Sequence, residues 1–245
     1  MTRILRIASL CVAACLLAVP VWAAEFTPTQ RAEIVQILRD ALKNDPSILR
    51  DAVTSMQAED GDRQQASSRA AIAAAKDTLV DAGDPTGGNP KGDVTIVEFF
   101  DTRCPYCRKL EPAMADLLAR DHGVRLVYKD LPILGAASVL GSKALLAAER
   151  QNGYEKLRTA IMDGPPQTTK PMIQDAAVRL GLDWKRLEHD MDNPAIQARI
   201  DANLKQARSL GIAGTPALVI GGELVPGAVD LPELQKMVAT TRAAK

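Results

Sequence analysis

The 245-residue sequence has no excess of either charge, with 30 basic and 30 acidic side chains, and only 3% of its residues are aromatic. A neutral chain without lysine and arginine clusters interleaved with aromatics offers little to a nucleic acid. Because aromatic residues are scarce, the core must be built mostly from alanine, leucine, isoleucine and valine. The length suits one sizeable domain with an additional segment.

Metal-binding and cross-linking residues are also few, with two histidines and four cysteines. A zinc site needs four ligands, and His122 and His189 are isolated in the sequence. Structural disulfides in exported proteins come as several pairs spread along the chain. The pair Cys104 and Cys107 closes a loop too short to restrain the unfolded chain. We therefore predict a redox-active disulfide between them, with no metal and no other cofactor.

Residues 1–23 are typical of a signal peptide. Arg3 and Arg6 precede an apolar run at 7–19, which is followed by small residues around Ala23. This run is too short for a membrane-spanning helix, which makes a membrane anchor the less favoured interpretation. A lipoprotein cleavage box ending at Cys15 is a minor alternative. Removal of the signal peptide removes Cys11 and Cys15 and leaves only the pair at 104 and 107.

Residues 24–82 are predicted to be a helical N-terminal region. Apolar residues recur at helical spacing over 27–44 and again after Asp45-Pro46, and residues 66–80 are rich in alanine. Gly61 lies in a polar stretch and is a possible break or hinge between helices. The narrow apolar stripes either pack on the main domain or join copies of the chain into an oligomer. The glycine- and proline-rich segment that follows predicts a linker at 83–93.

The remaining chain, 94–245, alternates strands and helices. Strands are predicted at 94–100, 124–129, 217–220 and 223–225, with Gly221-Gly222 as a hairpin turn between the last two. A helix that starts at the cysteine pair connects the first two strands as a βαβ unit. A helical tract occupies about 133–210, and a last helix spans 231–240. This order predicts an α/β, thioredoxin-like fold with an inserted helical subdomain.

The stretch Cys104-Pro105-Tyr106-Cys107 lies where a strand ends and a helix begins. Free backbone N–H groups and the helix dipole favour a thiolate at Cys104, and Pro105 suits the first helical turn. Arg103, Arg108 and Lys109 add positive charge nearby. We therefore expect Cys104 to be the exposed nucleophile and Cys107, one turn further on, to be the buried resolving thiol.

Two further features of the sequence complete the candidate site. Glu98 interrupts an apolar strand, where a buried carboxylate is costly unless it has a task. From beneath the cysteines it could exchange a proton with Cys107, although an edge-strand glutamate facing water is the alternative. Thr215-Pro216 precedes a strand, and a cis peptide bond there would bring the Thr215 backbone beside the thiols, where it could pair with an extended substrate.

These motifs resemble the DsbA-like branch of the thioredoxin superfamily, the periplasmic thiol:disulfide oxidoreductases. The resemblance covers about 94–244 and rests on VEFFDTRCPYCRK, YKDLPILGAASVLGSKALLAA and GIAGTPALVIGG. It implies that Cys104 is the nucleophile, Cys107 the resolving thiol, Glu98 the buried acid and Thr215-Pro216 the substrate clamp. The segment RAEIVQILRDALKNDPSILRDAVTSMQ resembles the N-terminal segment of ScsC-type proteins, named for suppression of copper sensitivity, some of which trimerise and act as isomerases.

Two residues differ from the strongly oxidising members. Tyr106 replaces the histidine of their central dipeptide Pro-His, and Thr215 replaces a valine. Pro105-Tyr106 should therefore give the cysteine pair a different reduction potential from theirs. We expect a value between about −270 mV and about −120 mV, the potentials of thioredoxin and DsbA. Glutaredoxins also carry the four-residue motif, but the export signal and the helical segments argue against that assignment.

The resemblance implies a periplasmic enzyme, a protein-disulfide oxidoreductase that forms or isomerises disulfides in exported proteins, with isomerisation favoured. Its partners would be exported clients with cysteines and a membrane redox partner that resets the pair, and it would form a homo-oligomer, with a trimer as one possible size. The alternatives are a monomeric disulfide donor and a copper-binding protein that holds Cu(I) on the two thiols.

Overall fold

A computed structural model describes residues 26–244, so the predicted signal peptide at 1–23 lies outside the described residues. Internal contacts divide the chain after Gln57 into two units. The first unit holds α1 (Pro28–Asn44) and the start of α2 (Ser47–Ala74). The second unit begins at Ala58 and holds the rest of α2 and all later elements.

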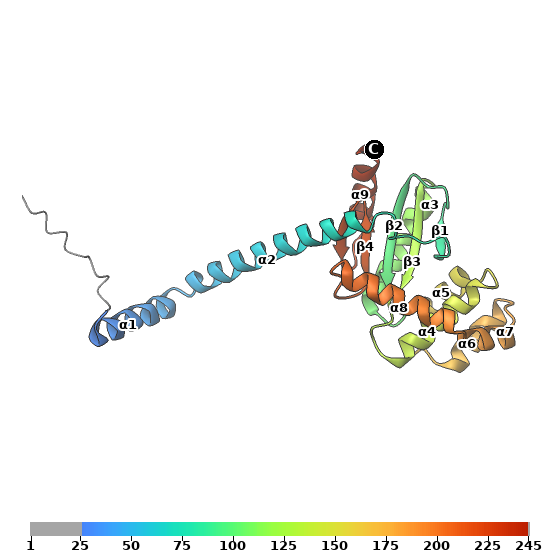
Figure 1. The fold of residues 1–245 in the computed structure, drawn as a ribbon, viewed down its shortest axis with the longest axis horizontal. Helices are drawn as coiled ribbons and strands as arrows, with labels where there is room; N and C mark the ends of the chain where they lie inside the picture. Colours follow the sequence, from blue (N-terminus) through green and yellow to red (C-terminus); the bar gives the residue numbers. More distant parts are fainter. Residues whose placement is uncertain (1–25, 245) are drawn as a thin grey trace, which may run out of the picture. The chain divides into compact units, whose positions relative to one another are not determined.

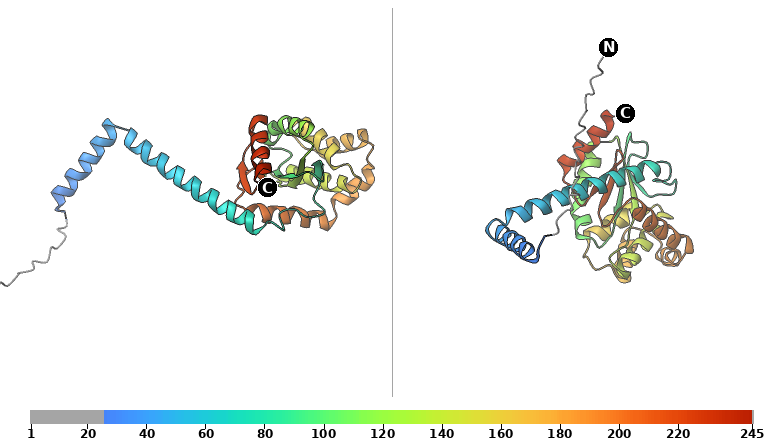
Figure 2. Two further views of the ribbon diagram at one scale, coloured as in Figure 1. Left: turned by 90° about the horizontal axis from the view of Figure 1, so that it is seen from above. Right: turned by 60° about the vertical axis from the view of Figure 1, so that its left-hand side comes forward.

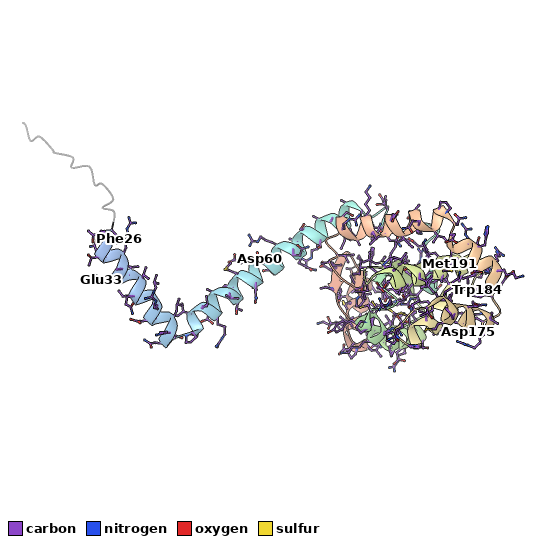
Figure 3. All side chains as sticks on the ribbon, turned by 90° about the horizontal axis from the view of Figure 1, so that it is seen from below. Phe26, Glu33, Asp60, Asp175, Trp184 and Met191 are labelled. Atoms are coloured by element: carbon purple, nitrogen blue, oxygen red, sulfur yellow. The ribbon has the colours of Figure 1, made fainter. Side chains whose placement is uncertain are left out.

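The described part of the first unit, residues 26–57, is helical and has no buried side chain. Thr27 caps α1, since its side chain accepts from the Gln30 N–H while the Gln30 side chain accepts from the Thr27 N–H. No side chain of α1 is buried, and Figure 3, which labels Phe26 and Glu33, draws the side chains around this helix. The apolar side chains that are more than a third exposed in this unit are Phe26, Ile34, Val35, Ile37, Leu38, Leu42, Ile48, Leu49, Val53 and Met56.

Helix α2 runs without a break through Gly61, so the predicted interruption there is wrong. A glycine inside a helix costs only about 1 kcal/mol relative to alanine, which a helix of 28 residues tolerates. In its second half Ser68 and Ile72 are buried, and the Gln65 side chain donates to the backbone carbonyl of Leu224 at 3.3 Å. The later part of the predicted N-terminal region therefore belongs to the second unit.

Five strands form one sheet in the order β1-β3-β2-β4-β5 (Figure 1). They are β1 (Thr86–Gly88), β2 (Val94–Phe100), β3 (Val124–Asp130), β4 (Ala217–Ile220) and β5 (Glu223–Pro226). β2 and β3 are parallel and joined through α3 (Pro105–Arg120), while the other pairs are antiparallel. The predicted βαβ unit is thus present, and β2 lies at the centre of the sheet.

Two glycine-containing segments pack closely on this sheet. Gly221 and Gly222 both have positive φ, 59° and 87°, as a two-residue hairpin turn of type I′ requires, so the predicted hairpin is confirmed.

The segment predicted as a linker instead contains β1, which pairs with β3. A Cβ at Gly88 would lie 2.7 Å from the Val124 carbonyl, so the absence of a side chain lets this edge strand approach.

Helices cover both faces of the sheet. α3 and α9 (Leu231–Ala243) lie on one face, and the second half of α8 (Pro194–Ser209) packs with the end of α2 on the other (Figure 2, left view). Residues of β2 alternate between the two cores: Ile96 and Phe100 pack on the first face, and Val97 and Phe99 on the second. This alternation places Glu98 on the same face as α3.

Between β3 and β4 the chain forms α4 (Ala136–Glu149), α5 (Tyr154–Asp163), α6 (Lys170–Arg179), α7 (Trp184–Met191) and α8. Three of these helices begin at side-chain caps, Thr169, Asp183 and Asn193, each of which accepts a backbone N–H of the first turn. The predicted α/β, thioredoxin-like fold with an inserted helical subdomain and a helical N-terminal extension is confirmed.

A buried ion pair joins the segment before β1 to the sheet. Lys129 Nζ lies 2.7 Å from Asp84 Oδ2, and their side chains are 1% and 0% exposed. Arg199 of α8 binds the other oxygen of Asp84. Removing one partner of a buried ion pair leaves an uncompensated charge in the interior and costs roughly 3–5 kcal/mol.

The substitution Asp84→Asn should therefore lower the free energy of unfolding by roughly 3–5 kcal/mol, because the Lys129 ammonium loses its counter-charge. Asp81→Asn is the matched control, since Asp81 is 59% exposed and lies 3.7 Å from Arg199, the arginine that also binds Asp84. It should cost less than about 1 kcal/mol. Urea denaturation of both variants measures the difference, and equal losses in the two variants would contradict this view of the pair.

Candidate active site

The cysteine pair lies at the start of α3, as predicted. Cys104 occupies the N-cap position and Pro105 the first helical turn. Asp101, the first residue after β2, is fully buried and orders the loop between this strand and Cys104. Its Oδ1 accepts from the Arg103 N–H at 2.8 Å. Its Oδ2 accepts from the N–H groups of Ile133 and Leu134 at 2.9 and 3.0 Å. Sequence reasoning missed this role, although an acidic residue between the strand and the cysteine motif is its signal.

Cys104 is buried, which corrects the prediction of an exposed nucleophile. It is 5% exposed, while its neighbour Tyr106 is 62% exposed. The cause is the loop before β4, whose Thr215 carbonyl accepts a hydrogen bond from the Cys104 thiol at 3.1 Å. The Thr215–Pro216 peptide bond is cis, as expected. Thr215 and Cys104 thus meet although they are distant in sequence.

Cys107 is fully buried, as predicted. Both cysteines are free thiols in the structure. Burial raises the pKa of the Cys107 thiol well above its usual range, and the nearby charges of Cys104 and Glu98 raise it further. A thiol in this state attacks slowly unless another group removes its proton.

Glu98 lies in the centre of β2 and is completely buried, so the edge-strand alternative is wrong. Burial raises the pKa of its carboxyl group to about 7, against the opposing attraction of Arg158. The carboxylates of Glu111 and Asp130 add to the rise. Near neutral pH this group can therefore both hold and release a proton, which is what an acid–base partner for a buried thiol requires.

Sequence reasoning missed the groups around Glu98. Arg158 of α5 lies 3.1 Å from Glu98 and 2.5 Å from Glu111 of α3. Asp130 at the end of β3 accepts from the Tyr154 hydroxyl at 2.7 Å, and burial raises the pKa of Asp130 to about 7. A charged residue among the apolar positions of an inserted helix is the sequence signal for Arg158. Periodicity does not tell which of the inserted helices faces the site.

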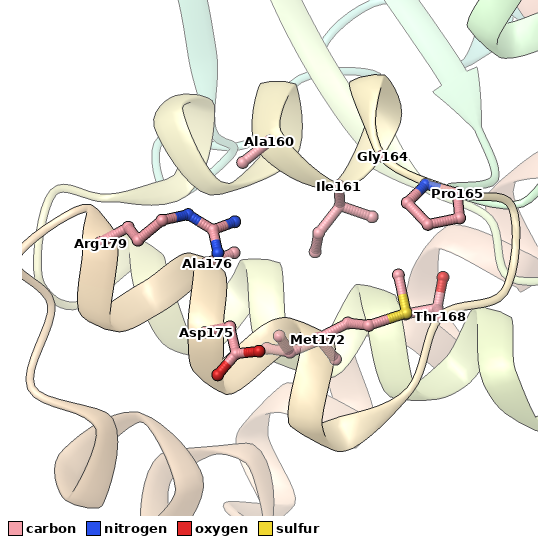
Figure 4. A pocket seen from close by; sticks show the side chains of 10 residues that line it. Ala160, Ile161, Gly164, Pro165, Thr168, Met172, Asp175, Ala176 and Arg179 are labelled. Atoms are coloured by element: carbon pink, nitrogen blue, oxygen red, sulfur yellow. The ribbon is translucent and has the colours of Figure 1, made fainter.

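The arginines next to the motif bind backbone carbonyls of the inserted helices. Arg108 donates to the carbonyls of Met162 and Gly164 at 2.5 and 2.6 Å, where α5 ends, and also to the Thr102 carbonyl at 2.9 Å. Figure 4 shows Gly164 and Pro165 in the turn after α5, beside a small cavity lined mostly by apolar side chains. Arg103 donates to the Leu134 carbonyl at 2.8 Å. These charges therefore fasten the helical subdomain to the cysteine loop, beyond the predicted role of nearby positive charge.

An apolar cavity lies beside Thr215, whose carbonyl binds the Cys104 thiol. Its lining includes Ile212, Thr215, Pro216 and Leu224, together with residues of the second half of α2 such as Gln64. Within residues 26–244 no group of three or more histidine, cysteine, aspartate or glutamate side chains is arranged to hold a metal ion.

The structure brings together the residues predicted to form the site: Glu98, Cys104, Pro105, Tyr106, Cys107, Thr215 and Pro216.

A CxxC pair at a helix N-terminus, beside a cis proline on a thioredoxin-like sheet, defines a protein of the thiol:disulfide oxidoreductase class. The family of the DSBA-like thioredoxin domain matches residues 95–239, and that of the copper resistance protein ScsC N-terminal domain matches residues 30–63. The chain belongs to the DsbA-like thioredoxin family and carries an ScsC-type N-terminal region.

Solved structures agree with this assignment. A thioredoxin-like oxidoreductase from Silicibacter pomeroyi DSS-3 is 40% identical, covers 68% of this chain and 96% of its own, and has a TM-score of 0.66. Proteus mirabilis ScsC in a transitional conformation is 28% identical over 90% of this chain and 100% of its own, with a TM-score of 0.66. The second match includes the N-terminal helices.

Curated relatives are of two kinds. The thiol:disulfide interchange protein DsbA of Bordetella parapertussis is 26% identical over 155 residues, which are 61% of this chain and 74% of that protein. The Na(+)/H(+) antiporter NhaA 3 of Salinispora tropica is 26% identical over 163 residues, and the chain spans about a quarter of its length. Among residues 26–244, no helix combines the length and the apolar character that crossing a membrane demands.

Replacing Cys107 with serine should make covalent adducts between Cys104 and disulfide substrates accumulate, because the thiol that resolves them is gone. The adducts are detected as mass increases by intact-mass spectrometry after incubation with a peptide disulfide. The control Cys104→Ser should give no adduct. Adducts that form equally well in Cys104→Ser would reverse the roles of the two cysteines.

Proposed function

We propose that the protein is a periplasmic thiol:disulfide interchange enzyme that isomerises disulfides in exported proteins. The juxtaposition of the Cys104 thiol and the Thr215 carbonyl at 3.1 Å carries this proposal, since it places the nucleophile beside a backbone able to pair with an extended chain. The assignment agrees with the family and with its periplasmic relatives. The working cofactor is the Cys104–Cys107 disulfide itself.

The reaction runs through a mixed disulfide. The Cys104 thiolate attacks one sulfur of a client disulfide, forms a new S–S bond and releases a client thiolate. That thiolate can attack another disulfide of the client and release a second client thiolate. The second thiolate attacks the client sulfur bound to Cys104 and displaces the Cys104 thiolate, which leaves the client isomerised and the enzyme reduced. If no rearrangement follows, Cys107 loses its proton to the Glu98 carboxylate and attacks Cys104. The enzyme then becomes oxidised and the client leaves reduced.

The cavity beside Pro216 suits an unfolded client. Ile212, Leu224 and Pro226 supply apolar surface, while Gln64 and Ser68 of α2 supply polar groups. A client segment that pairs with Thr215 would extend into this cavity, and its apolar side chains would replace water there. Such a site accepts many sequences, as an enzyme acting on misfolded proteins requires.

The exposed apolar side chains of the first unit support a homo-oligomer, with a trimer as one possible size. They include Leu38 and Leu42, 56% and 42% exposed and one helical turn apart. A stripe of this kind on a helix without a core is typical of association between chains. An oligomer would hold several Cys104 sites around one client and raise their effective concentration. A membrane redox partner would keep Cys104 reduced.

Copper binding is the second candidate function, because the matched N-terminal family is named for copper resistance. Thiolates are suitable ligands for Cu(I), and Cys104 and Cys107 would supply them. A monomeric disulfide donor remains the alternative within thiol chemistry.

The double substitution Leu38→Asp and Leu42→Asp should convert the oligomer into a monomer, because two charges replace the apolar stripe. It should also lower the rate at which reduced protein restores native pairing in a scrambled-disulfide substrate by about tenfold or more. Light scattering measures the mass, and recovered activity of the substrate protein measures isomerisation. Oxidation of a reduced substrate by the disulfide form should persist.

The matched control is Gln36→Asp with Asn44→Asp, which adds the same charge on the opposite side of α1 and should leave mass and isomerisation unchanged. A parent protein that is monomeric would remove the oligomer from the proposal. A parent protein that oxidises a reduced substrate but never rescues a scrambled one would identify a disulfide donor. Retention of Cu(I) by the parent but not by Cys104→Ser would support the second candidate.

A further inference from the structure

Glu98, the carboxylate beneath the cysteine pair, shares its ion-pair partner Arg158 with a second carboxylate, Glu111. Arg158 Nη2 lies 3.1 Å from Glu98 Oε2 and 2.5 Å from Glu111 Oε1. Its Nη1 lies 2.7 Å from Glu111 Oε2. Glu111 therefore accepts hydrogen bonds from Nη1 and Nη2 of Arg158 in a bidentate pair, while Glu98 accepts one hydrogen bond, from Nη2, at a longer distance.

The guanidinium is held in place by two aromatic rings. Its central carbon lies 4.4 Å from the ring centroids of both Phe100 and Tyr128, a distance at which a cation is attracted to a ring face. The Arg158 side chain is 4% exposed. It cannot turn toward solvent, so its charge stays fixed between the two carboxylates.

Neither Glu98 nor Arg158 has all its hydrogen-bonding atoms satisfied. Glu98 Oε1 and Arg158 Nε are buried and have no partner among the described residues. Because Glu98 Oε1 has no hydrogen-bond partner among the described residues, burial and the nearby charges decide how easily this carboxyl group ionises, and these charges are Arg158, Glu111 and Asp130. Other charged or titratable groups also act on this cluster. They are Cys107 and Arg108 of α3, Tyr128 and Asp130 of β3, and Tyr154 and Glu155 of α5.

We propose that Arg158 and Glu111 act as a positioning pair that sets the pH at which Glu98 accepts the proton of Cys107. Arg158 favours the ionised carboxylate of Glu98, and Glu111 opposes it by its charge and by taking two N–H groups. In the step concerned, the Cys107 proton moves to Glu98, the Cys107 thiolate bonds to Cys104 sulfur, and the substrate thiolate leaves. The inference rests on the proposed role of Glu98.

The two members of the pair have opposite effects, which gives a specific test. Loss of the Arg158 charge should raise the pKa of Glu98, so that the resolving step needs a higher pH. Loss of the Glu111 charge should lower it, because Arg158 then serves Glu98 alone. A merely structural role would move both variants in the same direction or not at all.

The experiment uses the reduced full-length mature protein and 5,5′-dithiobis(2-nitrobenzoate) as the disulfide. Attack by Cys104 releases one coloured thiolate, and resolution by Cys107 releases the second, so stopped-flow absorbance separates the two phases. In Arg158→Met the pH midpoint of the second phase should rise by about one unit or more, which makes this phase about fivefold or more slower at pH 7, because the parent midpoint lies near 7. In Glu111→Gln the midpoint should fall.

Arg158→Lys, which keeps the charge, should restore most of the parent midpoint, and Glu111→Gln tests the pair even if Arg158→Met does not fold. Glu98→Gln separates the two levels of the argument. If Glu98→Gln keeps the parent pH profile, the proposed role of Glu98 fails. If it abolishes the inflection while Arg158→Met and Glu111→Gln keep the parent midpoint or shift it in the same direction, the positioning pair is refuted.

Discussion

The buried carboxylate of Glu98 is the feature on which the rest of the site depends. It occupies the central strand, between β3 and β4, where water does not reach it. A carboxylate there opposes folding unless it is protonated or paired. The fold provides both conditions: burial raises its pKa, and Arg158 attracts the charged form. The result is a group that changes charge near neutral pH below a thiol that is hard to ionise.

This constraint gives the helical subdomain a part in the chemistry. Arg158 and Tyr154 reach the core from α5, and Arg108 of α3 holds the end of α5 through several backbone carbonyls. Contacts from α5 to Glu98 and from α3 to the end of α5 thus connect the inserted helices to the active site. The N-terminal unit contains none of the proposed catalytic groups, and its exposed apolar side chains are the basis of the proposed oligomer.

Local sequence patterns predicted the elements that short-range rules govern. The βαβ unit, the Gly221-Gly222 turn and the cysteines at a helix start all follow from spacing and backbone preference. Contacts between distant segments were predictable only where a motif marks them. Thr215 was expected beside the thiols, 111 positions away, but its covering of Cys104 was not. The contact of Glu98 with Arg158, 60 positions away, has no such motif. Gly61 was misjudged because the cost of one glycine is small beside the stability of a long helix.

The most direct test of this account is the titration of Glu98 itself in the reduced protein. Carbon-13 NMR of the side-chain carboxyl groups would follow it, with the signal identified by its loss in Glu98→Gln. The account predicts a midpoint near pH 7. A midpoint below about 5, close to that of an ordinary glutamate, would mean that the carboxylate stays charged throughout the working range. It would then not be poised to exchange a proton with Cys107.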